Sequence, residues 1–248
     1  MTARGDTRVG LALIVALGLG PGCSKSVPRS GTAQVGHHRV RFVLPAGWEH
    51  LDHGRQQLFR LNEAQLTLAD LGPATRAGML RELHAARDLW LAGRRRDAFE
   101  RVRELRSPAL RFAPWQRRLE FWTPWTDATY SPETADSAAI GPAFDALIQG
   151  TQTLPNETPD LLLAYVDALT AERPGREVHF RKRVTIHDAD WMDVETWSRV
   201  SHMNRSRTAF VVNGGYLLVL DIDRGVYERT GPAFDALLAS LEVAPAAR

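Results

Sequence analysis

Hydrophobic and polar residues alternate along several short segments of the chain, with the period of two that is typical of β-strands. In residues 39–44, for example, the apolar side chains of Val40, Phe42 and Leu44 share one face. Alternation or short apolar runs predict strands at 39–44, 57–61, 65–71, 177–187, 197–212 and 216–222. Asn213-Gly214-Gly215 predicts a hairpin turn between the last two, because these residues tolerate positive φ.

A helical period replaces the strand period in the middle of the chain. Met79, Leu83, Ala86 and Trp90 recur three or four residues apart, which predicts a helix with one buried face. Gly93 interrupts that helix, and a second helix is predicted after it. Further helices are predicted at 142–148, 158–171 and 232–241.

The segment Gly-Pro-Ala-Phe-Asp-Ala-Leu occurs twice, at 141–147 and at 231–237. The residues that precede the two copies show no similarity, so we interpret them as two helix starts and not as a duplicated domain. Pro142 and Pro232 are therefore expected in the first turn of a helix, where the missing N–H of proline costs no hydrogen bond.

The 248-residue chain has 44% hydrophobic and 24% charged residues, which excludes collagen-like and wholly disordered classes. Together with the element pattern, this composition predicts an α+β fold. We expect an antiparallel sheet built from both ends of the chain, with a packed C-terminal helix and a helical subdomain inserted at about 74–172. Residues 39–248 are expected to form a single domain.

An arginine-rich block and an acidic block follow one another within the predicted insertion. Residues 76–118 contain twelve arginines and five acidic residues, whereas residues 119–172 contain nine acidic residues and no lysine or arginine. Opposite charges at short range favour packing of the two blocks against each other. The aromatic-rich stretch 112–130 is expected to pack over the helices.

The N-terminus has the pattern of an export signal. Arg4 and Arg8 precede an apolar run, Val9 to Leu19, that is too short for a membrane span of about 20 residues. Small residues follow this run up to Cys23, which is the only cysteine of the chain.

The ending Leu19-Gly20-Pro21-Gly22-Cys23 resembles the lipobox of bacterial lipoproteins. That resemblance predicts a signal peptide at 1–22 and lipidation of Cys23, with serine after the cysteine indicating the outer membrane. Residues 23–38 are expected to be a flexible tether, because serine, glycine and proline are frequent there. The alternative is an ordinary secreted protein with a spare thiol.

The two ends of the predicted domain resemble the Mog1/PsbP-like fold, which occurs in many bacterial envelope lipoproteins. The similar residues are Val40-Arg41-Phe42-Val43-Leu44-Pro45-Ala46-Gly47-Trp48, Gly215-Tyr216-Leu217-Leu218-Val219-Leu220 and Phe234 through Leu241. The resemblance implies an opening strand that ends in a Pro-x-Gly-Trp corner, and a tyrosine-bearing central strand followed by a helix. It also implies an accessory, assembly or binding role without shared catalytic residues.

The sequence contains no motif for nucleotide binding or covalent catalysis: the phosphate-binding loop, the nucleophile elbow of serine hydrolases and the HExxH zinc motif do not occur. Ser201-His202 is not a nucleophile-base pair, because neighbours on the strand predicted there face opposite sides. We therefore expect no catalytic residues, no cofactor and no nucleic-acid partner.

Three clusters have the composition of a ligand site, although each has a simpler interpretation. His50, Asp52 and His53 could hold a metal, but a solvated loop explains them better. The acids Asp188, Asp190, Asp193 and Glu195 resemble a calcium loop only in composition and are interpreted as a charged loop between strands. Arg94-Arg95-Arg96 could contact anionic lipid headgroups or phosphate, but neighbouring acids favour a self-paired surface. We expect no metal site.

Two functions follow from these patterns. The first is a non-enzymatic, lipid-anchored protein of the bacterial envelope, facing the periplasm, which binds or scaffolds an unknown envelope protein. The second is a periplasmic enzyme or small-ligand-binding protein with a pocket between the sheet and the aromatic stretch 112–130. A pocket with converging histidine and aspartate side chains would favour the second.

Overall fold

The computed structural model describes residues 27–105, 137–153, 163, 167, 175–198, 205–224 and 227–245. The strands are β1 (Arg29–Val35), β2 (His38–Leu44), β3 (Glu49–Asp52), β4 (Gln56–Leu61), β5 (Ala64–Pro73), β6 (Arg176–Ile186), β7 (Ala189–Ser198), β8 (Arg205–Asn213), β9 (Tyr216–Arg224) and β10 (Glu242–Pro245). The helices are α1 (Arg76–Leu91), α2 (Arg95–Glu104), α5 (Ser137–Gln152) and α7 (Tyr227–Ser240).

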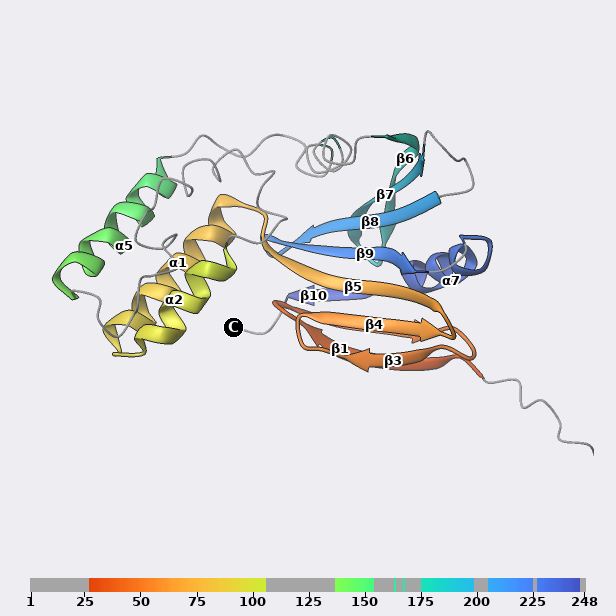
Figure 1. The fold of residues 1–248 in the computed structure, drawn as a ribbon, viewed down its shortest axis with the longest axis horizontal. Helices are drawn as coiled ribbons and strands as arrows, with labels where there is room; N and C mark the ends of the chain where they lie inside the picture. Colours follow the sequence, from red (N-terminus) through yellow and green to blue (C-terminus); the bar gives the residue numbers. More distant parts are fainter. Residues whose placement is uncertain are drawn as a thin grey trace, which may run out of the picture.

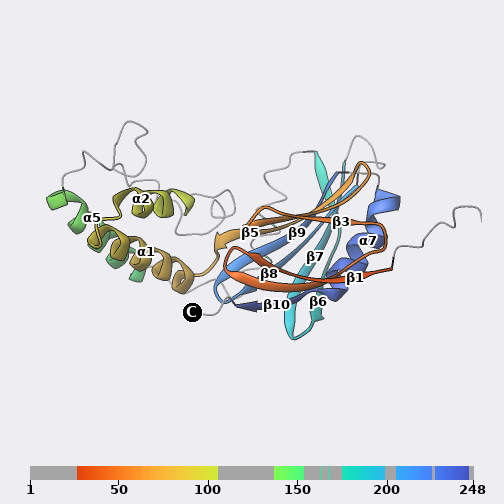
Figure 2. The same cartoon turned by 90° about the horizontal axis from the view of Figure 1, so that it is seen from below.

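The strands form two antiparallel sheets, and the fold class is α+β as the sequence predicts. A seven-stranded sheet has the order β3-β4-β5-β9-β8-β7-β6, and a three-stranded sheet has the order β1-β2-β10. The two sheets lie face to face with α7 at one end of them (Figures 1 and 2). Among the described residues, no helix is long and apolar enough to cross a membrane.

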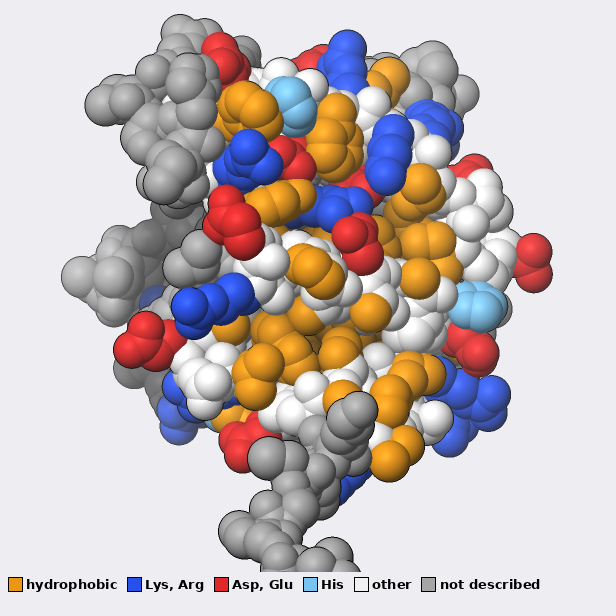
Figure 3. All heavy atoms as spheres, turned by 90° about the vertical axis from the view of Figure 1, so that its right-hand side faces the viewer, with side chains coloured by type: hydrophobic (Ala, Val, Ile, Leu, Met, Phe, Trp, Pro, Cys, Tyr) orange, Lys and Arg blue, Asp and Glu red, His pale blue; other side chains and the backbone are white. Residues whose placement is uncertain are grey.

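One hydrophobic core joins both sheets and α7. It contains Phe42 of β2, Leu68 of β5, Trp191 of β7 and Phe234 of α7, all nearly or fully buried. The other face of the seven-stranded sheet has a separate, smaller apolar cluster that includes Phe210. Seen from the end at which α7 lies, hydrophobic side chains gather in a hollowed band with charged side chains around it (Figure 3).

The helices α1, α2 and α5 form a second body beside the sheets, within the predicted insertion (Figure 2). Helix α1 starts at Thr75, whose hydroxyl accepts a hydrogen bond from the N–H of Gly78 at 3.0 Å. The break at Gly93 is confirmed, and its φ of 77° is one that glycine adopts easily.

Helix α5 of the acidic block packs on the arginine-rich helix α1, as predicted, whereas Asp167 of the same block pairs with Arg181 of β6. Helix α5 lies against α1, with Phe144 near Trp90 in the shared apolar cluster. Arg87 of α1 donates to Asp145 of α5 at 2.8 Å. The aromatic stretch 112–130, the helix at 158–171, Ser201-His202 and Cys23 lie wholly or mainly outside the described residues.

The predicted tether at 23–38 is wrong from Arg29 onward, because the chain there forms β1 and enters β2. The composition misled the prediction for a physical reason. Strand β1 pairs with β2 in the same sheet, and Gly31 stands directly opposite the large side chain of Phe42. An added Cβ at Gly31 would lie 2.5 Å from the ring of Phe42.

The interpretation of Asp188 to Glu195 as a loop is also wrong, and so is the single strand at 197–212. Residues 189–198 form β7, and a separate strand β8 starts at Arg205. The turn between β6 and β7 is only His187-Asp188, both with positive φ. Charged side chains at inward positions of β7 broke the apolar alternation that predicts a strand.

Both copies of the repeated heptamer are helical and bury the predicted apolar face, but the expected position of the prolines is wrong. Helix α5 begins at Ser137 and α7 at Tyr227, so Pro142 and Pro232 lie inside their helices. Each proline removes one main-chain hydrogen bond from its helix. The apolar residues of the heptamer, including the fully buried Phe144 and Phe234, hold these helices against their cores despite that loss.

The buried ring of Phe234 predicts a large loss of stability on truncation. Phe234→Ala should lower the free energy of unfolding by about 3–5 kcal/mol, because it leaves a cavity in the core shared by both sheets. Urea titration followed by circular dichroism measures this loss. Leu91→Ala is the control, since Leu91 is 66% exposed and its truncation should change stability by less than about 0.5 kcal/mol. Equal effects of the two substitutions would contradict the packing described here.

Candidate functional site

The register of β6, β7 and β8 brings charged side chains together on the sheet face that α7 covers. Lys182 of β6 stands opposite Asp193 of β7, and Glu195 of β7 stands opposite Arg207 of β8. Asp235 of α7 reaches the same place. We call Lys182, Asp193, Arg207 and Asp235 the Arg207 cluster.

Arg207 is the centre of this cluster and is almost fully buried. Its Nε and Nη2 donate to the two oxygens of Asp193 at 2.9 and 2.7 Å, and its Nη1 lies 2.7 Å from Asp235. The guanidinium lies between the rings of Phe180 and Phe234, at 5.5 and 4.9 Å from their centres. Burial alone would lower the pKa of Arg207, but the hydrogen bonds and charge of Asp193 outweigh burial and raise it. The cation therefore stays charged and ties α7 to the sheet.

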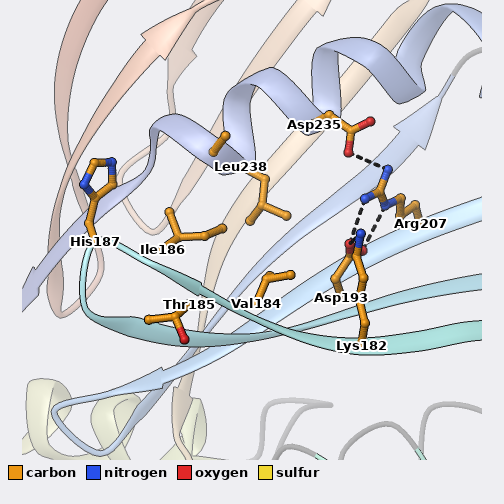
Figure 4. Close-up of a pocket in the computed structure, with 10 residues that line it drawn as sticks. Lys182, Val184, Thr185, Ile186, His187, Asp193, Arg207, Asp235 and Leu238 are labelled. Atoms are coloured by element: carbon orange, nitrogen blue, oxygen red, sulfur yellow. Dashed lines mark hydrogen bonds and ion pairs between the residues drawn. The ribbon is translucent and has the colours of Figure 1, made fainter.

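Beside the Arg207 cluster, a groove of about 440 Å³ runs between β6 and α7 (Figure 4). Its apolar walls are Val184 and Ile186 of β6 and Leu238 and Ala239 of α7. The charged cluster closes one end of the groove, and His187 lies at the other end, in the turn after β6 (Figure 4). The groove therefore combines an apolar interior with a polar end, which is the usual composition of a binding site.

Aromatic side chains continue the same region toward the start of β6. The ring of His179 stacks on Trp197 at 3.8 Å, and Arg205 lies 4.6 Å from the centre of that indole. Glu195 accepts hydrogen bonds from the Tyr227 hydroxyl at 2.5 Å and from the Trp197 indole. Burial, together with Glu195, raises the pKa of Tyr227 to about 12.

A second charged cluster lies where the helical insertion meets the sheets. We call His37, Asp70, Glu82, Arg101 and Tyr216 the His37 cluster. The imidazole of His37 lies between two carboxylates, with Nδ1 2.8 Å from Asp70 and Nε2 3.0 Å from Glu82. Glu82 also accepts from the Tyr216 hydroxyl at 2.8 Å and from Arg101 at 2.7 Å.

These contacts determine the charge states of the His37 cluster. Burial alone would lower the pKa of His37, but hydrogen bonds to Asp70 and Glu82 raise it to about 9. Burial alone would raise the pKa of Glu82, but hydrogen bonds from His37, Arg101 and Tyr216 lower it to about 2. The neighbouring His38 is fully buried and neither ring nitrogen has a hydrogen-bond partner in the described structure, so burial lowers its pKa.

A polar pocket of about 450 Å³ adjoins the His37 cluster, with Leu89 as its apolar residue. Its charged side chains are already paired: Arg101 with Glu82 at 2.7 Å, and Arg94 with Asp97 at 2.6 Å. A ligand would have to displace these pairs. We therefore assign the His37 cluster to the attachment of the helices and regard the β6–α7 groove as the candidate site.

Of the candidate residues from the sequence, Asp193 belongs to the Arg207 cluster, Glu195 stands opposite Arg207, and Arg94 lines the pocket beside the His37 cluster. His50 bonds to Gln57 at 2.6 Å, and Asp52 accepts from Gln57 and from the N–H of Gly54, so these side chains hold their own turn together. Within the described ranges, no group of three histidine, cysteine or acidic residues is placed to bind a metal.

The expected self-pairing of the arginine run is confirmed. Arg94 pairs with Asp97 and Arg96 with Glu100, while Arg95 lies 5.1 Å from the centre of the Trp90 ring.

Comparison with known proteins adds one structural neighbour. No family model matches the sequence, and no curated protein matches it. A similar solved structure is the solution structure of cyanobacterial PsbP (CyanoP) from Synechocystis sp. PCC 6803, with 12% sequence identity and a TM-score of 0.38. The match covers 92% of this chain and 99% of that chain. This similarity is too low to assign the chain to the family of that protein.

The His37 cluster predicts a stability maximum near neutral pH. His37 has a folded pKa raised from 6.5 to about 9, so its contribution is complete below pH 6.5 and is lost as the pH rises toward 9. The lowered pKa of His38 acts in the opposite direction, because its contribution is lost as the pH falls below 6.5. Glu82 adds a further loss between pH 4.5 and about 2.

Urea unfolding at a series of pH values tests this expectation. His37→Gln should flatten the decline of stability between pH 6.5 and 9 relative to the natural chain. His53→Gln, at an exposed histidine, is the control and should leave the decline in place. If the stability of His37→Gln declined between pH 6.5 and 9 as much as that of the natural chain, the His37 imidazole would not be held between the two carboxylates.

Removal of one partner from the buried Arg207 pair should be costly. Asp193→Asn should lower the free energy of unfolding by about 3–5 kcal/mol, because it leaves a buried guanidinium without its main counter-charge. Glu100→Gln breaks the exposed pair with Arg96 and should cost no more than about 1 kcal/mol. Thermal and urea unfolding of both variants give the comparison, and similar losses would mean that Arg207 is hydrated in solution.

Proposed function

We propose that the chain is a non-enzymatic binding protein of the bacterial envelope, anchored by lipid at Cys23, with its binding site in the groove between β6 and α7. The observation that carries the binding role is the groove itself. The groove has apolar walls, and the Arg207 cluster lies at one end of it. The charged side chains of that cluster pair with one another.

The state of the charged groups supports binding over catalysis. A general acid or base needs a pKa near the working pH and access to the substrate. Arg207 is held as a permanent cation, and Tyr227 has a pKa of about 12. Both groups also donate hydrogen bonds to neighbouring carboxylates, Arg207 to Asp193 and Tyr227 to Glu195. They therefore position α7 and do not face a reacting group.

The anchor rests on the sequence before residue 24. A lone cysteine at the end of a short apolar segment has no other evident use in a chain that cannot form an internal disulfide. The second function expected from the sequence used the aromatic stretch 112–130, which lies outside the described residues. Small-molecule binding is therefore kept as an alternative occupant of the same groove, on the strength of its volume.

Labelled palmitate fed to cells that express the full chain tests the anchor. We expect label on the natural protein, a mature N-terminus at Cys23 and fractionation with membranes, since two acyl chains anchor stably. Cys23→Ser should abolish the label and release the protein or leave its signal uncleaved. An unlabelled natural protein with another N-terminus would remove the anchored function and leave a secreted protein.

Site-directed photo-crosslinking tests the groove as the binding site. A benzophenone amino acid at Ala239, which lines the groove, should give a discrete cross-linked product in the native envelope. The same group at Ala236, an exposed position on α7 that does not line the groove, is the matched control. Equal cross-linking from both positions, or none from Ala239, would contradict a binding role for the groove.

A further inference from the structure

Strand β6 is a long strand at the end of a sheet. The seven-stranded sheet ends at β3 on one side and β6 on the other, and among the described strands β6 hydrogen-bonds with β7 alone. Strand β6 has 11 residues, whereas β3 has 4. The outer row of N–H and C=O groups on a long edge strand is a template for pairing with a further strand.

The groove lies on the sheet face next to this edge. Val184 and Ile186 point from β6 toward α7 and are only half-buried (Figure 4). Neighbouring strands lie about 4.8 Å apart, and alternate side chains of each strand share a face. A strand added outside β6 would therefore place every second side chain beside Val184 and Ile186, in the space under Leu238 and Ala239.

The charge of β6 favours one kind of added strand over another. The strand carries Arg176, Arg181, Lys182 and Arg183 against a single acid, Glu177. Lys182 is about half exposed although it pairs with Asp193 at 3.5 Å, and Arg181 is about half exposed although it pairs with Asp167 at 3.2 Å. Pairing with a second copy of β6 would bring two such basic runs together, which is unfavourable. An acidic strand is complementary.

We propose that the edge of β6 accepts an extended acidic segment of a partner protein as an eighth strand of the sheet. This proposal rests on the binding function proposed above. Main-chain hydrogen bonds to β6 supply the general affinity of this interaction. Specificity comes from apolar side chains that enter the groove at alternate positions and from acidic side chains near the half-exposed Arg181. The segment therefore alternates apolar and acidic residues over about five to seven positions.

Selection from a displayed library of random 12-residue peptides tests the pattern on the full-length chain. Enriched peptides should alternate apolar residues with aspartate or glutamate. Binding of synthetic copies should weaken as salt rises, because exposed charges are screened at high ionic strength. Enrichment of basic or unpatterned peptides, or no enrichment over the Ala239→Trp protein, would overturn the proposal.

Two variants with matched controls localise the interaction. Ala239→Trp fills the groove and should weaken binding of a selected peptide about tenfold or more, an effect of about 1.4 kcal/mol. Ala236→Trp on the same helix should not change it. Arg181→Glu should weaken binding at low salt, whereas Arg39→Glu, at an exposed strand position in the other sheet, should not. Unchanged binding in Ala239→Trp would overturn the assignment.

Amide hydrogen exchange with and without peptide tests the strand geometry. Residues 176–186 should exchange more slowly in the complex, because outward N–H groups of β6 become hydrogen-bonded. Peptide binding without protection of β6 would overturn strand addition.

Other occupants of the edge or the groove would give different experimental results. A doubled mass in light scattering would indicate a second copy, and displacement of an apolar dye without any peptide enrichment would indicate a small molecule. If position 239 still cross-links in the envelope while the peptides fail, the binding function stands and strand addition is wrong.

Discussion

Strands β5 and β9 pair in the middle of the seven-stranded sheet, and the two halves of the chain meet there. The pairing places the end of β5 beside the β8–β9 turn, where Ala74 and Thr75 donate main-chain hydrogen bonds to the carbonyl oxygen of Gly215. Helix α1 starts from that contact, so closely that an added Cβ at Gly78 would lie 2.4 Å from the same oxygen. The position of the helical insertion is therefore determined by the register of β5 on β9. The His37 cluster then fixes α1 through Glu82.

The sheet face that packs against α7 contains both a buried cation and an apolar groove. A guanidinium inside an apolar core needs counter-charges within hydrogen-bond distance, and Arg207 obtains them from Asp193 and Asp235. The charged side chains gather at one end of the space between β6 and α7, and the walls beyond them are mainly aliphatic side chains. The groove is therefore charged at one end, where the register of β6, β7 and β8 brings the ion pairs together, and apolar along its walls.

Periodicity predicted much of the fold because most strands keep a clean alternation and most helices keep an apolar stripe. The prediction failed where the partner determines the residue type. Strand β1 resembles a linker because Phe42 occupies the space in front of Gly31. Strand β7 resembles a charged loop because Asp193 and Glu195 are buried against Arg207 and Tyr227. The Arg207 cluster draws on β6, β7, β8 and α7, and local pattern contains no information on such distant partners.

The strand order has a consequence for folding during synthesis. Strand β2 lies between β1, which precedes it, and β10, which comes from residues 242–245 near the other end of the chain. Neither sheet is complete until the last strands of the chain are available, since β5 likewise awaits β9. A chain emerging from a ribosome would therefore expose the apolar residues of β2 and β5 until strands β9 and β10 had been synthesised.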